Sequence, residues 1–468
     1  MVTYFPKYFS DRAILIYVIL LLLIPIAFGY PMAWYWWLFG LAEVGGFFYF
    51  SNALTKKWSR LNGTALEQKL FLSSALVRLI YVVISFFVYT SLTGDPFEFG
   101  AADARWYDSM GRLGSEIIWG ADIEWSVFTE GVDWTDLGYP TYLAVLYALL
   151  GKSILLTRCV KGLLGAWTVV LMYRLARRNF GDEVGRMTGI FCMLMPNLIF
   201  YCGIHLKETE MLFLTVFFIE RADKIFRSTH ASGQDIFLLV LSGIASYFFR
   251  GVLCALLFLT IAATAVMGSA KIKKGGKWAI EGMLLFLLGG LVLWNITSET
   301  LQVGDYSNVQ EQQNDNMQWR AERSGGNAFA VKAGAAVFAP LIFTIPFPTM
   351  VNIPYQQDQQ MIHGGNFVKN ITSFFTILAM FLLLLSGKWR DNLLPIAFSL
   401  GYLVVLVFSN YAQSERFHIP SLPFELMFAA YGLSQFKNRY KNWFTIWLAF
   451  IFVANVGWAW FKLRGRGM

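Results

Sequence analysis

The sequence predicts an all-α, polytopic transmembrane helical bundle of about 11–14 spans with two larger extracytoplasmic loops. Composition and patterning predict this class. Of the 468 residues, 56% are hydrophobic and 15% are charged, and the mean hydropathy is +0.51. The apolar residues also occur in repeated blocks of about 17–25, the helix length that crosses about 30 Å of hydrocarbon. This composition excludes a soluble multidomain enzyme.

The predicted helices follow from these apolar blocks, taken in chain order. Each block approaches the length of a spanning helix, and a polar or glycine-containing loop follows it. The two blocks that flank Arg250 carry the weakest signal because the first is short. We expect about thirteen spans, near residues 13–29, 31–50, 71–93, 153–175, 185–203, 208–224, 236–249, 251–269, 279–297, 366–386, 393–411, 419–436 and 443–461.

Basic residues predict the orientation of the bundle. The chain has 38 Lys+Arg and 30 Asp+Glu, a formal net charge of +8. In a membrane protein such an excess belongs in short cytoplasmic loops, so it does not imply nucleic acid as a partner. With the N-terminus inside, the tail residues Lys462, Arg464 and Arg466 lie outside, against the preference of basic residues for the cytoplasmic side. The predicted cytoplasmic loops do carry basic residues, namely Lys56, Lys57 and Arg60; Arg174, Arg177 and Arg178; Lys271, Lys273, Lys274 and Lys277; Lys388 and Arg390; and Lys437, Arg439 and Lys441.

The chain divides into four predicted regions. No A-x-A cleavage site follows the first span, which indicates a retained signal anchor. The four cysteines lie in or beside apolar blocks without CxxC spacing, which argues against a disulfide framework or a zinc site. The regions are an N-terminal transmembrane hairpin with a basic cytoplasmic loop (1–70), a transmembrane core with an acidic extracytoplasmic loop at 94–152 (71–297), a second extracytoplasmic loop (298–365) and C-terminal transmembrane helices (366–468).

The loop 94–152 is acidic and rich in Trp and Tyr, a combination that suits a sugar because rings stack on its C–H faces and carboxylates bind its hydroxyls. Asp103 and Tyr107 have helical spacing and follow the third span closely. Asp103 could therefore accept a proton from an acceptor hydroxyl or hold a divalent cation against a phosphate. Alternatively, Asp103 caps or solvates a surface helix, and Asp108 is a second carboxylate or a solvated charge.

Three charges, Lys207, Glu208 and Glu210, stand at the predicted outer start of a span. Acidic residues are favourable at a helix N-terminus through the helix dipole, whereas a lysine there is unfavourable. Lys207 therefore needs a partner, either one of the two glutamates or an anionic ligand. A phosphate at a helix N-terminus beside a lysine is a common solution.

Further cations lie at the ends of spans. Arg250, between two apolar runs, is costly unless it faces an interface or a lined cavity, so it is either a phosphate ligand or an arginine that reaches the lipid headgroups. Arg158 and Lys161 present the same choice, and we expect Lys161 to snorkel. Arg416 and His418 lie in a proline-containing segment before a span, where His418 is either a ligand or a hydrogen-bonded structural group.

In order, these motifs resemble the GT-C superfamily of membrane glycosyltransferases, which includes the protein O-mannosyltransferases and the lipid A aminoarabinose transferase. The resemblance extends from about residue 71 to residue 435. Its elements are Asp103 and Tyr107 in the first outer loop; Gly138-Tyr139-Pro140-Thr141-Tyr142 and the basic loop that ends at Gly181; Pro196 followed by Lys207-Glu208; Arg250 at a span junction; and Arg416 to Pro423.

The resemblance implies inverting transfer of a sugar from a polyprenyl-phosphate donor to a hydroxyl of a lipid-linked or cell-surface glycan, at the extracytoplasmic face. Asp103 would be the catalytic or metal-orienting carboxylate, with Mg or Mn as the candidate cation. Asp103 stands between two alanines, whereas many relatives have adjacent acidic residues, which places metal dependence in doubt. Glu208 would be a second catalytic acidic group, and substrate would contact Tyr107, Asp108, Arg158, Lys207, Glu210, Arg250, Arg416 and His418.

Two other functions compete with this interpretation. A polymerase or ligase of surface polysaccharide would use polyprenyl-diphosphate-linked glycans and would also need outer arginines. A lipid or glycan transporter or flippase would need a charged path through the bilayer and inverted repeats, and the sequence shows neither. The low cysteine content and compact loops suit a bacterial inner membrane with a periplasmic active site.

Overall fold

The computed structural model describes residues 3–130, 132–229, 231–269, 318, 327, 339–409 and 411–468. Throughout these residues the regular structure is helical, with no strand. Within this described part of the chain, six helical segments are long and apolar enough to cross a membrane. Together with the composition, they confirm an all-α integral membrane protein. The six segments are Lys7–Phe28, Gly63–Thr93, Ile154–Phe180, His363–Leu385, Lys388–Phe408 and Asn438–Arg464.

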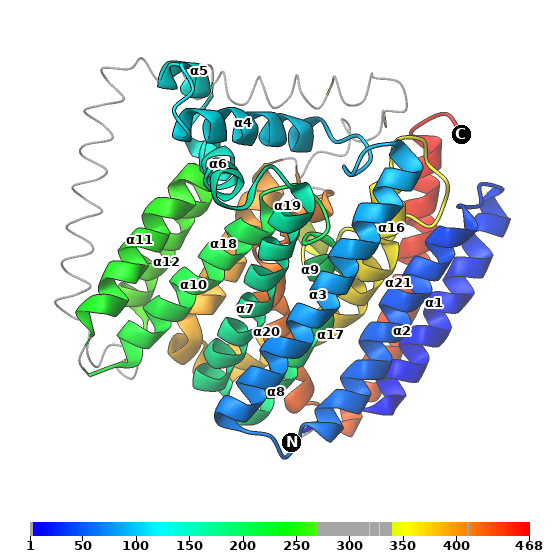
Figure 1. Ribbon diagram of the computed structural model, residues 1–468. Helices are drawn as coiled ribbons and strands as arrows, with labels where there is room; N and C mark the ends of the chain where they lie inside the picture. Colours follow the sequence, from blue (N-terminus) through cyan, green and yellow to red (C-terminus); the bar gives the residue numbers. More distant parts are fainter. Residues whose placement is uncertain are drawn as a thin grey trace.

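The predicted spans correspond to described helices, with one exception. The span expected near 279–297 lies outside the described residues, as do Lys271 to Lys277 and most of the second loop, 298–365. The matching helices lie side by side in the bundle (Figure 1). They are α1 (Lys7–Phe28), α2 (Trp34–Lys57), α3 (Gly63–Thr93), α7 (Ile154–Phe180), α8 (Asp182–Leu194), α10 (Glu208–Arg227), α11 (Gly233–Phe249), α12 (Gly251–Met267), α17 (His363–Leu385), α18 (Leu393–Phe408), α20 (Leu422–Ser434) and α21 (Lys441–Arg464).

Two predicted boundaries are wrong for identifiable reasons. The span expected at 185–203 is divided, because α8 ends at Leu194 and the short α9 (Pro196–Phe200) begins at a proline, which cannot donate the helical hydrogen bond. Helix α3 begins at Gly63 rather than at residue 71. Its polar first turns continue the helix beyond the apolar block that marked the predicted span.

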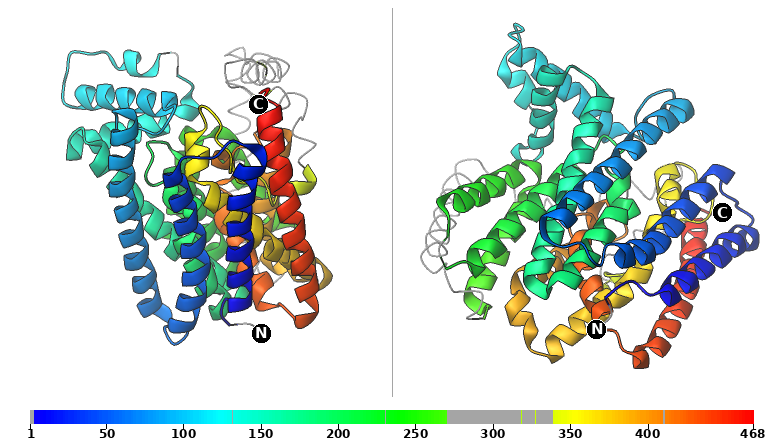
Figure 2. Two further views of the ribbon diagram at one scale, coloured as in Figure 1. Left: turned by 90° about the vertical axis from the view of Figure 1, so that its right-hand side faces the viewer. Right: turned by 60° about the horizontal axis from the view of Figure 1, so that its bottom comes forward.

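The two ends of the bundle differ. Helix α4 (Ala102–Ile118) lies across one end, together with α5 (Trp125–Thr129) and α6 (Gly138–Leu150) (Figures 1 and 2). We call this the outer end, following the orientation that the basic loops predict, and we call the opposite end, which carries the N-terminus, the inner end. The C-terminus lies at the outer end. The basic tail is therefore on the side that the thirteen-span count predicted, where Lys462 donates hydrogen bonds to Gln356 and Gln359.

Helix α4 is held against α6 by close backbone approach. Its buried face includes Ala104, Tyr107, Gly111 and Gly114, which recur at helical spacing. A Cβ added at Gly111 would lie 2.7 Å from the Leu143 Cβ, and one at Gly114 would lie 2.7 Å from the Ala144 Cβ. Both distances are too short for two carbon atoms, so glycine is required at these two positions. This packing fixes the helix that presents Asp103.

Candidate active site

A cavity of about 410 Å³ lies at the outer end, where several segments distant in sequence converge. The first turns of α4 form one wall. The short helices η1 (Trp134–Asp136) and α19 (Glu415–His418), the start of α10 and the joint between α11 and α12 form the rest. The lining residues are Ala102, Asp103, Trp106, Tyr107, Asp136, Lys207, Arg250, Arg416 and Phe417.

Arg416 joins two predicted acidic residues across this cavity. Its Nη1 donates to Asp103 Oδ2 at 2.6 Å, and its Nε donates to the Glu208 carboxylate. The Glu208 side chain is buried, whereas 59% of the Asp103 side chain is exposed. Burial lowers the pKa of Arg416, but the two carboxylates outweigh burial and raise this pKa well above its usual value. Arg416 therefore remains a guanidinium cation that holds α4 and α10 together.

Lys207 stands directly before α10, as the sequence predicted. Its Nζ donates to the Asp136 carboxylate and, at 2.8 Å, to the carbonyl oxygen of Phe249. It also lies 6.0 Å from the centre of the Tyr107 ring. Burial lowers the pKa of Lys207 below its usual value, and the Asp136 hydrogen bond offsets part of this decrease. The ammonium thus lies in the cavity wall with one carboxylate beside it.

Arg250 occupies the joint between α11 and α12 in an extended backbone conformation, with φ −169° and ψ 108°. Its carbonyl oxygen accepts from the amides of Leu253 and Cys254, so the residue also begins α12. The guanidinium lies 4.9 Å from the centre of the Phe417 ring, within cation–π distance. Among the described residues, no carboxylate forms an ion pair with it, which distinguishes Arg250 from the other two cations of the cavity.

Tyr107 also lines the cavity. Its ring packs at a right angle to that of Tyr139, with centroids 5.0 Å apart. Burial raises the pKa of Tyr107, and the neighbouring Arg416 offsets this increase in part. The phenol therefore stays neutral at physiological pH, so it offers a hydrogen-bonding hydroxyl to a ligand and no charge.

The structure thus brings together Asp103, Tyr107, Lys207, Arg250 and Arg416, with Glu208 joined to them through Arg416. The other four predicted site residues lie elsewhere. Asp108 accepts from Arg112 at 2.7 Å and from the Tyr147 hydroxyl at 2.5 Å; Arg158 is fully buried, with Glu98 Oε2 3.8 Å from its Nη2; Glu210 lies 3.6 Å from Lys161; and His418 is buried against Lys369.

The expectation that Lys161 snorkels is wrong. Its side chain is 1% exposed, and its Nζ donates to the carbonyl oxygens of Ile204 and Leu206. Helix α7 packs against α3, α8 and α10, so this part of it lies inside the bundle. A lysine in that position has backbone carbonyls within reach and no route to the headgroups.

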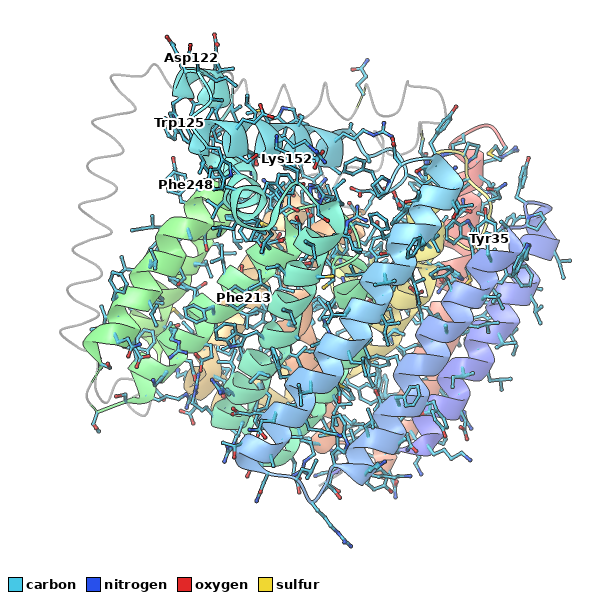
Figure 3. The ribbon with its side chains drawn as sticks, in the orientation of Figure 1. Tyr35, Asp122, Trp125, Lys152, Phe213 and Phe248 are labelled. Atoms are coloured by element: carbon cyan, nitrogen blue, oxygen red, sulfur yellow. The ribbon has the colours of Figure 1, made fainter. Side chains whose placement is uncertain are left out.

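Four lining residues were not predicted individually, namely Ala102, Trp106, Asp136 and Phe417. Asp136 belongs to the acidic loop, but nothing in its local sequence indicates that η1 folds back onto Lys207. Trp106 and Phe417 each adjoin a predicted residue and supply the aromatic part of the wall. Further acidic and aromatic side chains of this loop, including Asp122 and Trp125, lie above the bundle at the far end of α4 (Figure 3). Only part of the acidic loop 94–152 therefore lines the cavity.

The residues of the cavity do not fit a divalent cation. Within the described part of the chain, no three His, Cys, Asp or Glu side chains lie close enough together to hold a metal ion. Asp103 and Glu208, the two carboxylates predicted to act at the site, both contact the Arg416 guanidinium instead.

Comparisons with known proteins give one structural likeness. No family model and no curated protein matches the sequence. A solved structure that is similar is the crystal structure of ArnT from Cupriavidus metallidurans bound to undecaprenyl phosphate, at 15% sequence identity and a TM-score of 0.48. The alignment covers 82% of this chain and 62% of that one, so the chain spans less than two thirds of its neighbour's length.

Proposed function

We propose that this protein is an integral membrane glycosyltransferase that transfers a sugar from a polyprenyl-phosphate-linked donor to an acceptor hydroxyl at the extracytoplasmic face. One observation carries the proposal. A cavity at the outer end combines a half-exposed carboxylate, Asp103, with three cations from three different segments, Lys207, Arg250 and Arg416. A membrane lipid presents its phosphate near the ends of spanning helices, and a transfer to a hydroxyl requires both a base and cations beside the phosphate.

Arg250 is the first ligand that we assign to the donor phosphate. It forms no ion pair with a carboxylate of the described residues, so it can bind an oxyanion without breaking an ion pair. Lys207 and Arg416 lie in the same wall and complete the cationic side. The three cations face the three carboxylates of Asp103, Asp136 and Glu208, which leaves the cluster neutral. This balance favours a phosphodiester, with one negative charge, over a diphosphate with two or more.

The chemical step then follows from the placement of Asp103. The acceptor oxygen attacks the anomeric carbon of the donor, and the bond between that carbon and the phosphate oxygen breaks. The proton of the acceptor hydroxyl passes to the Asp103 carboxylate, which acts as the general base. The bonding electron pair leaves with the polyprenyl phosphate, whose new charge is stabilised by Arg250, Lys207 and Arg416. A single displacement of this kind inverts the anomeric configuration.

A glycan acceptor suits the aromatic edge of the cavity. Trp106 lines it and is 39% exposed, and Trp134, two residues before Asp136, is 61% exposed. Indole rings offer flat apolar faces for the C–H surface of a sugar, and Asp136 and Asp103 offer acceptors for its hydroxyls. We assign the acceptor to a lipid-linked or cell-surface glycan and the protein to cell-envelope polysaccharide biosynthesis, in a bacterial inner membrane with a periplasmic active site.

The first experiment measures sugar release from a radiolabelled polyprenyl-phosphate monosaccharide by the purified protein in detergent, with and without EDTA. Wild type should consume the donor, and Asp103→Asn and Arg250→Ala should not, while both variants keep the wild-type melting temperature. We expect EDTA to have no effect, because the described residues offer no three-ligand metal site. Consumption by Asp103→Asn at the wild-type rate would contradict the assignment.

The same assay separates the competing functions. A polymerase or ligase would ignore a monosaccharide monophosphate and consume a polyprenyl-diphosphate-linked glycan. A flippase would consume neither donor, and it would move a labelled lipid across a vesicle membrane.

A further inference from the structure

Two buried lysines contact segments that adjoin the cavity lining. Lys161 lies on α7 and Lys369 on α17, and their side chains are 1% and 2% exposed. Neither residue lines the cavity. A buried ammonium is costly unless its hydrogen bonds are satisfied, so each lysine needs a reason to be there.

The two ammonium groups make the same kind of contact. Lys161 Nζ donates to Ile204 O at 2.9 Å and to Leu206 O, while its nearest carboxylate oxygen, on Glu210, lies 3.6 Å away. Lys369 Nζ donates to Ile345 O at 2.6 Å and to His418 Nδ1 at 2.7 Å, while Glu425 Oε2 lies 3.9 Å away. Lys161 thus holds two carbonyls of the non-helical segment before α10, whereas Lys369 holds one carbonyl of a non-helical segment and the ring of His418, the last residue of α19. In both cases a glutamate balances the charge from a greater distance.

Two of these segments, the one before α10 and α19, carry a cation of the cavity. Leu206 directly precedes Lys207, and Lys207 directly precedes Glu208. In α19, His418 Nε2 donates to Ala412 O at 2.8 Å, which leaves Nδ1 to accept from Lys369. Arg416 lies between Ala412 and His418, so this contact closes the turn that presents it.

We propose that Lys161 and Lys369 are positioning residues of the candidate active site, Lys161 for Lys207 and Lys369, through His418, for Arg416. Each lysine fixes the backbone of a short segment whose own helical hydrogen bonds are few. The side chain that the segment presents is thereby held at the donor phosphate. This proposal rests on the proposed function for the identity of the ligand, but not for the contacts themselves.

Double-mutant cycles test whether each lysine acts through its own cation. The measured quantity is the affinity of the purified protein for polyprenyl phosphate in detergent. Lys369→Met alone and Arg416→Ala alone should each weaken binding about 5-fold to 20-fold. Once Arg416 is removed, Lys369→Met should change the affinity by less than about 2-fold, because residues that act through one contact are not additive. The same holds for Lys161→Met with Lys207→Met.

The crossed pairs are the matched control. The effects on affinity should multiply in these pairs, because each pair removes two separate contacts. The pairs are Lys369→Met with Lys207→Met, and Lys161→Met with Arg416→Ala. Multiplicative effects in the direct pairs as well would overturn the proposal, since a general loss of structure predicts them. If a lysine variant is too unstable to purify, His418→Gln and His418→Leu replace it. Glutamine keeps an acceptor and a donor, so His418→Gln should bind polyprenyl phosphate nearly as tightly as wild type. His418→Leu should bind it as weakly as Arg416→Ala does.

Amide hydrogen exchange tests the contacts without any ligand. Lys369→Met should accelerate exchange across residues 412–419 and leave 203–207 unchanged, and Lys161→Met should do the reverse. Uniform acceleration in both segments would overturn the assignment of each lysine to its own segment. If wild type does not bind polyprenyl phosphate, the proposed function fails, and the exchange pattern still decides whether the lysines position these segments.

Discussion

Clusters of charged side chains occur at both ends of the bundle, and they are built differently. At the inner end, Arg178 donates to Glu220 at 2.7 Å and to Asp223 at 2.8 Å, and Arg227 pairs with Asp223 at 2.9 Å. Asp235 accepts from both Arg221 and Lys224, each at 2.8 Å. Each cation of this inner cluster has a carboxylate partner. These contacts join α7, α10 and α11.

The outer cluster, at the cavity, has the same residue types in a different arrangement. Arg416 holds two carboxylates, Lys207 holds one, and Arg250 pairs with no carboxylate of the described residues. The outer cluster also adjoins a cavity of about 410 Å³. The two clusters contain similar charges. The outer one differs in having, among the described residues, a cation without a carboxylate partner and an exposed carboxylate beside a cavity, and the functional proposal rests on this difference.

The largest expected effect is on Asp103, the proposed base. Asp103→Asn should lower the rate of sugar transfer about 10²-fold to 10⁴-fold, because the amide cannot accept the acceptor proton. Its melting temperature should change little, since the side chain is 59% exposed and such ion pairs stabilise weakly. Steady-state transfer rates and thermal unfolding in detergent are the measurements. Asp95→Asn, which removes the exposed pair with Arg105 outside the cavity, is the matched control and should be fully active.

The next-largest effect tests Arg250, the cation of the cavity without a carboxylate partner among the described residues. Arg250→Ala should weaken donor binding about 10-fold to 100-fold, the range expected for a lost hydrogen bond to a charged group. Arg250→Lys should recover only part of the affinity, because a lysine offers a point charge without the planar fork. The donor KM measures both variants. An unchanged donor KM in Arg250→Ala would place the phosphate elsewhere and remove the main difference between the two clusters.

Substitutions in the inner cluster should lower stability and leave activity unchanged. Arg178→Met leaves the buried carboxylates of Glu220 and Asp223 without this partner, and we expect it to lower the free energy of unfolding by about 1–3 kcal/mol. The transfer rate per folded molecule should stay at the wild-type value. Thermal unfolding, combined with activity normalised to the folded fraction, gives both quantities. A loss of donor affinity in this variant would mean that the two ends are coupled.

The sequence predicted the outer cluster better than its detailed contacts. Helical spacing after the third span was enough to place Asp103 and Tyr107 on one helix at the membrane surface, and their α4 helix is confirmed. The cost of an intramembrane arginine was enough to single out Arg250. These predictions needed local sequence only. Which residues then share a cavity depends on tertiary packing, and there the sequence was less informative.

Asp108 and Asp136 show why. Asp108 follows Asp103 by five residues, which rotates it about 140° around the helix axis, so it turns toward Tyr147 on α6 rather than into the cavity. Asp136 reaches Lys207 because η1 folds onto the start of α10, a contact across 71 residues that no local pattern encodes. Lys369 likewise acquires its partners only through packing, although a lysine inside an apolar span was itself a signal.

A smaller effect concerns pH and tests Lys207. Because burial lowers the pKa of Lys207 below that of an ordinary lysine, its ammonium loses its proton at a lower pH. Donor affinity should therefore fall on the alkaline side as the pH rises through this lowered pKa. Lys207→Arg should shift that alkaline limb to higher pH, since a guanidinium stays protonated. Donor KM measured across the alkaline range, with Arg178→Lys as the control from the inner cluster, decides this.

The smallest effect separates the acceptor from the donor. Trp134→Ala should raise the KM for a glycan acceptor about 2-fold to 10-fold, the range of an aromatic contact beyond its buried area, and leave the donor KM unchanged. Trp119→Ala provides the control, because Trp119 is also exposed but stands at the end of α4 that is far from Asp103, whereas Trp134 is two residues from the lining residue Asp136. If both variants behave alike, the exposed tryptophans contact the lipid interface rather than a sugar. If Trp134→Ala changes the donor KM instead, both Arg250 and the aromatic edge bind the donor. The acceptor must then enter from another side of the cavity.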